Sequence, residues 1–477
     1  MRGILGFAGY VPYHRLDRSA ITEASGTNAG KGTRSVASYD EDTTTMAVAA
    51  ARLALRPLGD HGRATPRALW FSTTAPAYTD KTNATIVHAA LRLDPEAGAF
   101  DANGSVRSAM GALRAALTGT ETTLVVAADV RTGLPTSADE REGGDAAAAV
   151  LVGDDTDGPV LADYLGGASL SEEFLDRWRT PGDVRSKQWE ERFGEMQYVP
   201  LGQQAWKQAL ESTGLAPADI AQVVVAGTHA RAVRQVSAKI TPGTGGAAED
   251  LLATVGNPGA AQPALLLAHA LERAQAGDVI ALVVLADGAD VALFRATAAL
   301  DTHVPASPVG AQITAGRDGL RYLTFLAWNA MVTIEPPRRP EPARASSSAA
   351  ARNDDWKFGF VASRDRATGA VHLPPARVSY QGGALDDMEP LPMADATGTI
   401  VTFTIDRLAY SPSPPIVFAV VDFDEAAGGG RLPMELTDVA AEDVAIGERV
   451  EVTFRRINRA DGIQNYFWKA KLIREDA

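Results

Sequence analysis

The chain has 477 residues, 45% hydrophobic and 22% charged, which is the composition of a folded protein with more than one domain. It contains no cysteine, and this excludes disulfides, thiolate catalysis, cysteine-ligated zinc and iron–sulfur clusters. Its net charge of −14 has the wrong sign for binding a phosphate backbone, so we expect no nucleic-acid partner. No stretch approaches the roughly 20 apolar residues of a membrane span, and the N-terminus lacks the apolar run of a signal peptide. We therefore expect a cytoplasmic protein with no membrane partner.

Residues 1–334 alternate helical patterns with short apolar strands, which is typical of a layered α/β fold. The same order of elements occurs twice, as helix, strand, helix, strand and closing strand. These elements are predicted at 42–55, 67–74, 105–117, 123–130 and 145–153, and again at 200–214, 221–229, 259–275, 278–288 and 290–297. In GGDAAAAVLVG, residues 143–153, the small side chains predict a close approach of the backbone to another element.

A linker is predicted at residues 335–355, EPPRRPEPARASSSAAARNDD, because its prolines and its lack of apolar periodicity disfavour a regular element. Strand patterns separated by Pro, Gly and Asp clusters dominate the remaining chain, and we divide it into a ribbon-like segment, 356–390, and a barrel, 391–477. Five strands of this length fit a small closed barrel of the OB type, although their spacing also fits a sandwich. They are predicted at 398–410, 414–423, 431–439, 448–457 and 466–473.

Five segments of the first part resemble archaeal-type hydroxymethylglutaryl-CoA synthases, in the order in which that family carries them. They are VASYDEDTTTMAVAAARLAL (36–55), FSTTAPAYTDKTNATIVHAAL (71–91), FLDRWRTPGDV (174–184), GTHARAVR (227–234) and VGNPGAAQPALLLAHALERAQAGD (255–278). The resemblance covers most of residues 1–330. It implies the duplicated, five-layered α/β fold of the thiolase superfamily for residues 1–334, which agrees with the repeat of elements.

The resemblance also implies a reaction that this chain departs from. In the family, a cysteine thiolate takes an acyl group from coenzyme A, and condensation follows with help from His, Asn and, in the synthases, Glu. The position of the nucleophile, at the start of a helix, holds Val106, which has no lone pair and cannot form an acyl-enzyme. The position of the glutamate holds Thr74, which cannot act as a carboxylate base. Ser105 and Ser108 flank Val106, but a serine without a base within hydrogen-bond reach is a poor nucleophile, so we do not favour Ser105 as a replacement.

His229 and Asn257 occupy the positions where the family holds its His and Asn. They could polarise an acyl carbonyl by hydrogen bonds, a role that needs no thiol. The alternative, equally weighted, is that His229 is a polar residue at a strand end and that Asn257 caps a helix. Arg231 and Arg234 follow, and the resemblance suggests contact with CoA phosphates there, although exposed arginines are more often only solvated.

Residues 354–383 resemble the zinc ribbon of acyl-CoA-associated zinc-ribbon/OB-fold proteins, which accompany thiolases and synthases. That family holds Zn²⁺ with two CxxC pairs. Here the matching positions are Asp365 and Thr368, then Ser379 and Gly382. One carboxylate and two hydroxyls do not make a structural zinc site, so we expect no metal. The strands that follow resemble the OB barrel of the same family.

Three functions remain open at this point. The first is a non-condensing subunit that binds coenzyme A or an acyl-CoA and uses its barrel to scaffold a partner thiolase. The second is an enzyme of changed chemistry, such as a cysteine-independent retro-aldol C–C lyase or an acyltransferase, with His229 or Tyr78 handling the proton. The third is an interaction protein that binds no CoA. We expect a homodimer through the thiolase-like part, because that family pairs its central strands.

Overall fold

The computed structural model describes residues 1–58, 65–383 and 385–474. The chain forms two compact units. Unit 1 consists of Met1–Ala37, Ala49–Thr85 and Leu93–Phe325, and unit 2 consists of Ser38–Val48, Ile86–Arg92 and Leu326–Ala477. Unit 2 therefore contains two short segments from the first hundred residues together with the C-terminal part. Among the described helices, none combines the length and apolar character needed to cross a bilayer.

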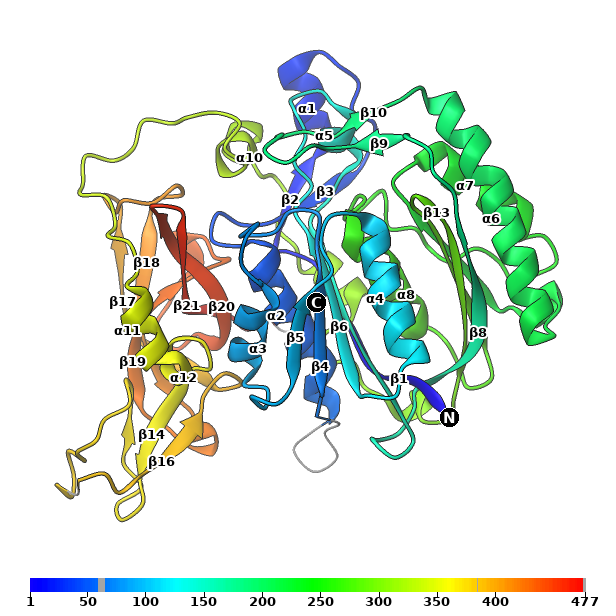
Figure 1. Ribbon diagram of the computed structural model, residues 1–477. Helices are drawn as coiled ribbons and strands as arrows, with labels where there is room; N and C mark the ends of the chain where they lie inside the picture. The colour runs from blue at the N-terminus through cyan, green and yellow to red at the C-terminus, as the bar shows by residue number, and fades with distance from the viewer. Residues whose placement is uncertain (59–64, 384, 475–477) are drawn as a thin grey trace. The chain divides into compact units, whose positions relative to one another are not determined.

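The described part of unit 1 is built on a nine-stranded sheet whose two halves repeat one pattern (Figure 1). In the first half β4 is parallel to β6 and β6 is antiparallel to β7, and in the second half β11, β12 and β13 pair in the same way. This confirms the predicted duplication. In sheet order the strands are β11 Gln222–Gly227, β12 Val279–Leu285, β13 Gly288–Ala296, β8 Ala162–Ser171, β1 Arg2–Tyr10, β7 Ala146–Asp154, β6 Thr123–Asp129, β4 Ala68–Ser72 and β5 Gly98–Asp101.

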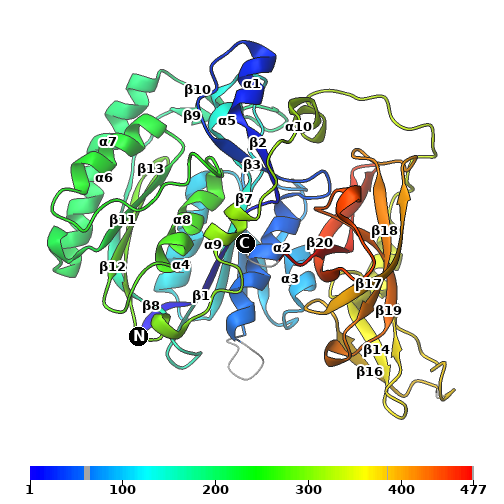
Figure 2. The same ribbon diagram turned by 180° about the vertical axis from the view of Figure 1, so that it is seen from behind.

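Two buried helices, α4 (Val106–Thr118) and α8 (Gln262–Leu271), lie between the halves of the sheet (Figure 1). Helices α6 (Glu191–Thr213) and α7 (Ala230–Ile240) cover the outer face of the second half, as Figure 2 shows. The other helices and short strands of this part of the chain are α1 Arg18–Ser25, α2 Thr43–Leu55, α3 Ala84–Leu91, α5 Ala138–Glu142, α9 Val309–Thr314, α10 Tyr322–Trp328, β2 His14–Asp17, β3 Thr33–Val36, β9 Arg177–Trp178 and β10 Lys187–Gln188.

Small residues let the layers approach one another. Strand β7 has four consecutive alanines, all fully buried. Just before it, a Cβ at Gly144 would overlap the carbonyl oxygen of Val255. This confirms the close approach predicted for residues 143–153, and it explains why side chains larger than Ala are missing at the start of this strand.

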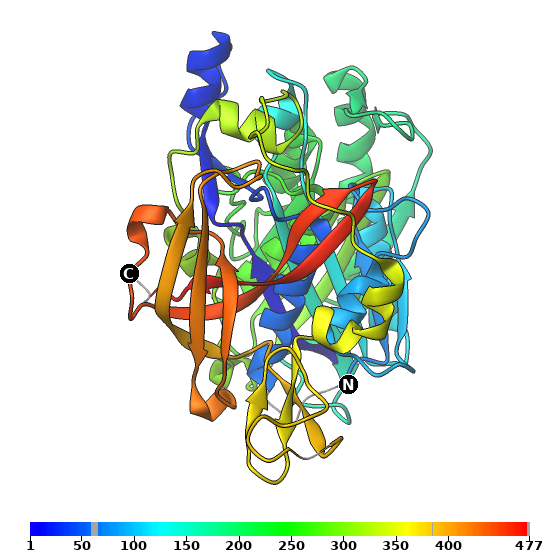
Figure 3. The same ribbon diagram turned by 90° about the vertical axis from the view of Figure 1, so that its left-hand side faces the viewer.

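Unit 2 contains a closed five-stranded barrel and a small three-stranded sheet, counted over its described residues (Figure 3). The barrel confirms the predicted OB-type closure. Its strands, in order, are β17 Thr397–Asp406, β18 Ile416–Phe423, β19 Arg431–Leu436, β21 Ile463–Leu472 and β20 Arg449–Ala460. The small sheet consists of β15 Val371–His372, β14 Val361–Asp365 and β16 Met388–Pro392.

The segment predicted as a linker contains a regular element that the sequence analysis did not expect. Helix α11 (Ser347–Arg352) begins after the last proline of the segment, and α12 (Asp354–Lys357) follows it. The hydroxyl of Ser346 accepts a hydrogen bond from the backbone N–H of Ala349 at 3.3 Å and caps α11. A serine cap, followed by two serines and three alanines, is sufficient for a short helix once proline no longer interferes.

Candidate functional site

Val106 is the first residue of α4, and its side chain belongs to the apolar core between the two halves of the sheet. Only 9% of it is exposed. Ser105 precedes the helix in an extended conformation but makes no side-chain capping bond, and its Oγ lies 3.3 Å from Oγ of Ser108. The helix start therefore presents an isopropyl group and a pair of hydroxyls that face each other.

Arg107, the next residue, attaches the start of α4 to the second half of the sheet. Its Nε donates to the carboxylate of Asp290 at 3.0 Å, and its terminal nitrogens donate to the backbone oxygens of Asp287 and Leu170 at 2.6 and 2.7 Å. The sequence analysis did not single out this arginine, because its partners lie far away in the chain. The contacts fix the orientation of the helix N-terminus, where backbone N–H groups favour negative charge.

Thr74 is bound to a buried aspartate at the end of β6. Its backbone N–H and its hydroxyl donate to the two carboxylate oxygens of Asp129 at 2.6 and 2.9 Å. The hydroxyl of Thr73 and the backbone N–H of Ala260 donate to the same carboxylate at 2.9 and 2.8 Å. Asp129 is fully buried, and these four donors satisfy it. Thr74 thus stabilises the buried carboxylate of Asp129 by hydrogen bonds.

His229 caps helix α7 with its own ring. Its Nδ1 accepts the backbone N–H of Ala232 at 3.1 Å, which requires that this nitrogen carries no proton. Its Nε2 lies 2.9 Å from the backbone oxygen of Glu191, so Nε2 carries the proton and donates it. Both ring nitrogens are used within the chain.

Asn257 is also engaged by the backbone. Its Nδ2 donates to the carbonyl of Gly227 at 2.8 Å, and its Oδ1 accepts the N–H of Gly259 at 2.9 Å. The side chains of Thr74, His229 and Asn257 therefore all bond to atoms of unit 1 itself. In this arrangement both ring nitrogens of His229, and one N–H and the carbonyl oxygen of the Asn257 amide, are bonded to the backbone.

A buried acid that the sequence analysis missed lies beside His229. Asp176 is 6% exposed, and burial raises its pKa while the neighbouring His229 opposes that rise. Helix α6 approaches both residues at Gly194, where a Cβ would lie 2.6 Å from Cδ2 of His229 and closer still to Oδ1 of Asp176. The ring of Tyr198 is centred 5.9 Å from the imidazole, and burial raises its pKa as well. Three ionisable side chains, those of Asp176, Tyr198 and His229, therefore gather at this point of unit 1.

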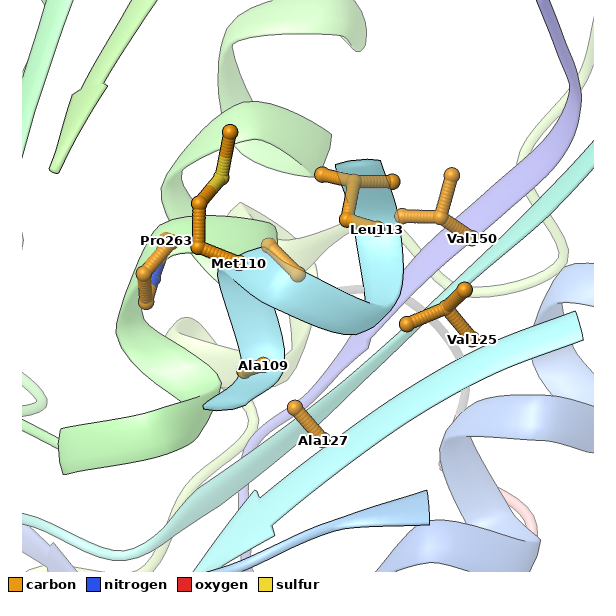
Figure 4. A pocket seen from close by; sticks show the side chains of 8 residues that line it. Ala109, Met110, Leu113, Val125, Ala127, Val150 and Pro263 are labelled. Carbon is orange, nitrogen blue, oxygen red and sulfur yellow. The ribbon is translucent and has the colours of Figure 1, made fainter. Parts of the chain in front are cut away.

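The space between α4 and α8 is too small for a substrate. Figure 4 shows the cavity, which has a volume of about 10 Å³, room for at most one water. Its walls are apolar and come from α4, α8 and the strands beneath them. The lining residues are Ala109, Met110, Leu113, Val125, Ala127, Val150, Pro263 and Ala264.

A larger pocket, of about 400 Å³, opens elsewhere on unit 1. Two indole rings, those of Trp178 and Trp189, form part of it, with centroids 6.5 Å apart and planes at 43°. The complete lining is Ser137, Ala138, Asp139, Trp178, Arg185, Ser186, Lys187, Gln188 and Trp189. Aromatic faces beside an arginine and a lysine suit a ligand that has both a flat ring and negative charge. The alternation of cationic and aromatic residues in RWRTPGDVRSKQW is the sequence pattern that could have indicated this pocket.

The carboxylate of Asp139, in the lining of this pocket, is paired with two arginines. Asp139 contacts Arg131 at 3.2 Å and Arg177 at 2.7 Å. Burial alone would raise the pKa of Asp139, but the two guanidinium groups outweigh it and hold the pKa below its ordinary value. Its charge is balanced, so it does not repel an anion. By contrast, Arg231 is paired with Glu191 at 3.4 Å and Glu195 at 2.8 Å, and Arg234 lies exposed on α7.

Comparisons with known proteins agree with this architecture. Residues 392–455 match the family described as "ChsH2, C-terminal OB-fold domain". The hydroxymethylglutaryl-CoA synthase of Pyrococcus furiosus is 30% identical over 226 residues, which are 46% of this chain and 63% of that protein. A DUF35 domain-containing scaffold protein of Methanocaldococcus jannaschii is 26% identical over 122 residues, 24% of this chain and 84% of that protein. The chain is hydroxymethylglutaryl-CoA synthase-like, with a C-terminal OB fold.

A solved structure supports the fold of this synthase-like chain. The crystal structure of an HMG-CoA synthase complexed with CoA superposes with a TM-score of 0.58 at 17% identity, over 72% of this chain and 93% of that one. At such low identity the likeness shows the fold alone. The synthase-like chain spans 63% of the length of the Pyrococcus synthase, so the activity of that enzyme is not thereby assigned to it.

Proposed function

We propose that this synthase-like chain binds an acyl-CoA without forming an acyl-enzyme, and that its barrel scaffolds a partner thiolase. The observation that carries the first part is Val106 at the start of α4, in a chain without any cysteine. An acyl group can be transferred to a side chain only if that side chain has a nucleophilic atom. The internal hydrogen bonds of Thr74, His229 and Asn257 support the proposal, because these side chains bond to other parts of the chain itself.

The pocket around Trp178 and Trp189 is the proposed entrance for the ligand. Coenzyme A combines a flat purine ring with phosphates, and the indoles with Arg185 and Lys187 offer the complementary groups. Arg234 is a second candidate for a phosphate contact, as is Arg231 if its acidic partners release it. The CoA bound in the structure of an HMG-CoA synthase is consistent with a ligand of this class.

Thermal unfolding with and without CoA tests the binding. A ligand that binds only the folded chain raises the unfolding temperature, and at about 100 times its dissociation constant it stabilises by about 2.7 kcal/mol. We expect the shift to disappear in a double variant, Arg185→Ala with Lys187→Ala. The matched control replaces two exposed lysines of α6 and α7, Lys207→Ala with Lys239→Ala, and should keep the shift. If both double variants lost the CoA-dependent shift equally, the shift would depend only on the net charge of the chain.

The scaffolding role rests on the similarity of 122 residues of this chain to a DUF35 domain-containing scaffold protein. Purification of the full chain from its native host provides the test. We expect an untagged protein with thiolase activity to copurify in a fixed ratio. Recovery of the chain by itself, with thiolase activity left wholly in the flow-through, would contradict the role.

We also propose that the chain is a homodimer that pairs through β5. This strand ends the sheet, hydrogen-bonds to β4 on one side, and carries Phe100, which is 49% exposed. The opposite edge strand, β11, is bordered by residues 245–248, whose backbone bonds to Val223. The edge at β5 is therefore the more available of the two for pairing with a second copy. Light scattering should give twice the chain mass, and Phe100→Lys should shift it to the monomer.

A Cys-independent enzyme is the second candidate, and the buried Asp176 beside His229 favours it. Retro-aldol cleavage needs a base and a site for the oxyanion but no acyl-enzyme. Catalysis would require the ring of His229 to leave its bonds to Ala232 and Glu191. Turnover of an acyl-CoA by the purified chain, lost in His229→Ala and in Asp176→Asn, would establish this candidate over the first.

A further inference from the structure

Two short loops of unit 2, residues 365–369 and 379–383, share one pattern of hydrogen bonds from backbone N–H groups to their first residue. In the first loop the carboxylate of Asp365 accepts the N–H of Ala367 at 2.9 Å, and its backbone oxygen accepts the N–H of Gly369 at 2.8 Å. In the second loop Oγ of Ser379 accepts the N–H two residues on at 3.3 Å, and its backbone oxygen accepts the N–H of Gly383 at 3.1 Å. Both loops end in a glycine with positive φ, 75° and 64°. We call these two loops the twin knuckles.

The twin knuckles direct four side-chain positions toward one point. The hydroxyl of Thr368 donates to Oδ2 of Asp365 at 2.6 Å, and the side chain of Ser379 is hydrogen-bonded to the same carboxylate. The fourth position is Gly382. A Cβ there would lie 3.2 Å from Cγ2 of Thr368 and 3.4 Å from Oδ2 of Asp365. Asp365 and Ser379 are buried whereas Thr368 and Gly382 are exposed, so the four positions meet near the surface of the small sheet.

A zinc ion does not fit the groups that meet at this point. Structural zinc is held by four thiolates or imidazoles in a tetrahedron. Here the positions supply one carboxylate, two hydroxyls and a glycine without a side chain. In the part of the chain that the structure describes, no three His, Asp or Glu side chains gather as a metal-binding cluster. The four positions lie close together, but the groups that they carry are not those of a zinc site.

We propose that the carboxylate of Asp365 takes the place of a metal ion at the centre of the twin knuckles, and that the backbone around it remains a latent tetrahedral metal site. A carboxylate can accept several hydrogen bonds at once, and charged acceptors make the stronger ones. The donors from Thr368, Ser379 and the backbone of Ala367 link the two loops through one residue. The bonds from Ser379 and Thr368 lower the pKa of Asp365 to about 2, so the centre carries its charge at neutral pH.

Restoring thiols at the four positions tests the latent site directly. The full chain is prepared with Asp365→Cys, Thr368→Cys, Ser379→Cys and Gly382→Cys, in a background that has no other cysteine. We expect one zinc per chain after dialysis and, with Co²⁺, the absorption of a tetrahedral thiolate complex. The matched control puts the same number of cysteines on the exposed parts of the same loops, at Arg366, Ala367, Tyr380 and Gln381. It should hold no stoichiometric metal.

Folding of the quadruple variant is checked by circular dichroism with zinc present during refolding. A folded quadruple variant that binds no more zinc than the control would overturn the latent site. If that variant does not fold, the double variant Ser379→Cys with Gly382→Cys, which leaves Asp365 in place, is compared with the wild type for Co²⁺ binding. Failure of this variant to bind Co²⁺ while folded would likewise count against the latent site.

The role of Asp365 is tested in the otherwise unchanged chain by amide exchange at 365–370 and 379–383. We expect exchange in both loops to rise about tenfold in Asp365→Ala, because one residue holds the two loops together. Removal of metal with EDTA should leave exchange in the wild type unchanged. Protection that falls with EDTA, or stoichiometric zinc in the purified wild type at these loops, would refute the proposal.

Discussion

The ammonium nitrogen of Lys469 lies 2.9 Å from the carboxylate of Asp40, and both side chains are completely buried in unit 2. Lys469 belongs to barrel strand β21, whereas Asp40 belongs to the segment 38–48, which packs with the barrel. Thr437 also donates its hydroxyl to Asp40, at 2.8 Å. Because a charge without a partner is costly inside a protein, the segment and the barrel depend on each other.

More charges surround this pair. Among the described side chains, Arg455 contacts Asp40, Glu41 and Asp438 at 3.7, 3.0 and 2.6 Å, and Lys469 also bonds to Glu435. Burial alone would raise the pKa of Asp40, but Lys469 and Arg455 outweigh it and keep the pKa below its ordinary value. Acidic side chains outnumber the cations in this cluster, so removal of one cation should have a large effect.

Lys469→Met should therefore destabilise the chain strongly. It removes the cation that Glu435 bonds to and leaves Asp40 with Arg455 alone, at 3.7 Å, and breaking a buried pair in this way costs about 3–5 kcal/mol. Urea unfolding followed by circular dichroism measures the change. The control is Lys471→Met, on the same strand, whose partner Glu451 lies 3.0 Å away with about a quarter of both side chains exposed. It should cost less than about 1 kcal/mol, and an equal loss in both variants would contradict the importance of burial.

The stability difference between wild type and Lys469→Met should depend on pH. The pKa of Asp40 is lowered in the folded chain, so its contribution is complete above its unfolded value of about 3.9 and is lost as pH falls through the folded value. We expect a constant difference between pH 7 and pH 5 and a smaller one at pH 3. Urea titrations at the three pH values provide the measurement. A difference that grows on acidification would show that Asp40 is not ionised in the native state.

Val106→Cys should restore the first half of the missing reaction. A thiol at the start of α4 would lie where the helix dipole lowers its pKa, and it would be the sole cysteine of the chain. We expect one acetyl group per chain after incubation with acetyl-CoA, measured by intact mass, and no condensation product because Thr74 provides no base. The wild type should remain unmodified. Val125→Cys places an equally buried thiol in the middle of β6 and should also remain unmodified.

Asp129→Ala should destabilise unit 1, because it leaves four hydrogen-bond donors, from Thr73, Thr74 and Ala260, without their acceptor. Leaving buried donors unsatisfied costs about 1–3 kcal/mol each, although the effects do not simply add. We expect a loss of at least about 3 kcal/mol in chemical unfolding. Asp250→Ala, which removes an exposed carboxylate with a bond to the N–H of Leu252, should change stability by less than about 1 kcal/mol. Similar effects of the two substitutions on stability would mean that the four hydrogen bonds to Asp129 do not stabilise unit 1.

Local sequence patterns predicted a large part of this fold. The repeat of helices and strands in residues 1–334 and the five strands of the barrel follow from the spacing of apolar residues, which is a local property. The prediction failed at α11, where a short Ser/Ala run forms a helix inside a proline-rich segment. The absence of cysteine and the isopropyl group of Val106 are facts of covalent chemistry, so the sequence by itself excludes a cysteine acyl-enzyme and any acyl-enzyme at position 106.

Tertiary structure alone decided how the polar groups are used. Only the fold shows that the side chains of His229 and Asn257 bond to the backbone at Ala232 and Gly227. The pairing of Asp40 with Lys469 and the pocket around Trp178 join segments that are distant in the chain. The physical reason is that a hydrogen bond or an ion pair depends on a separation of about 3 Å in space, and periodicity along the sequence carries no information about that distance.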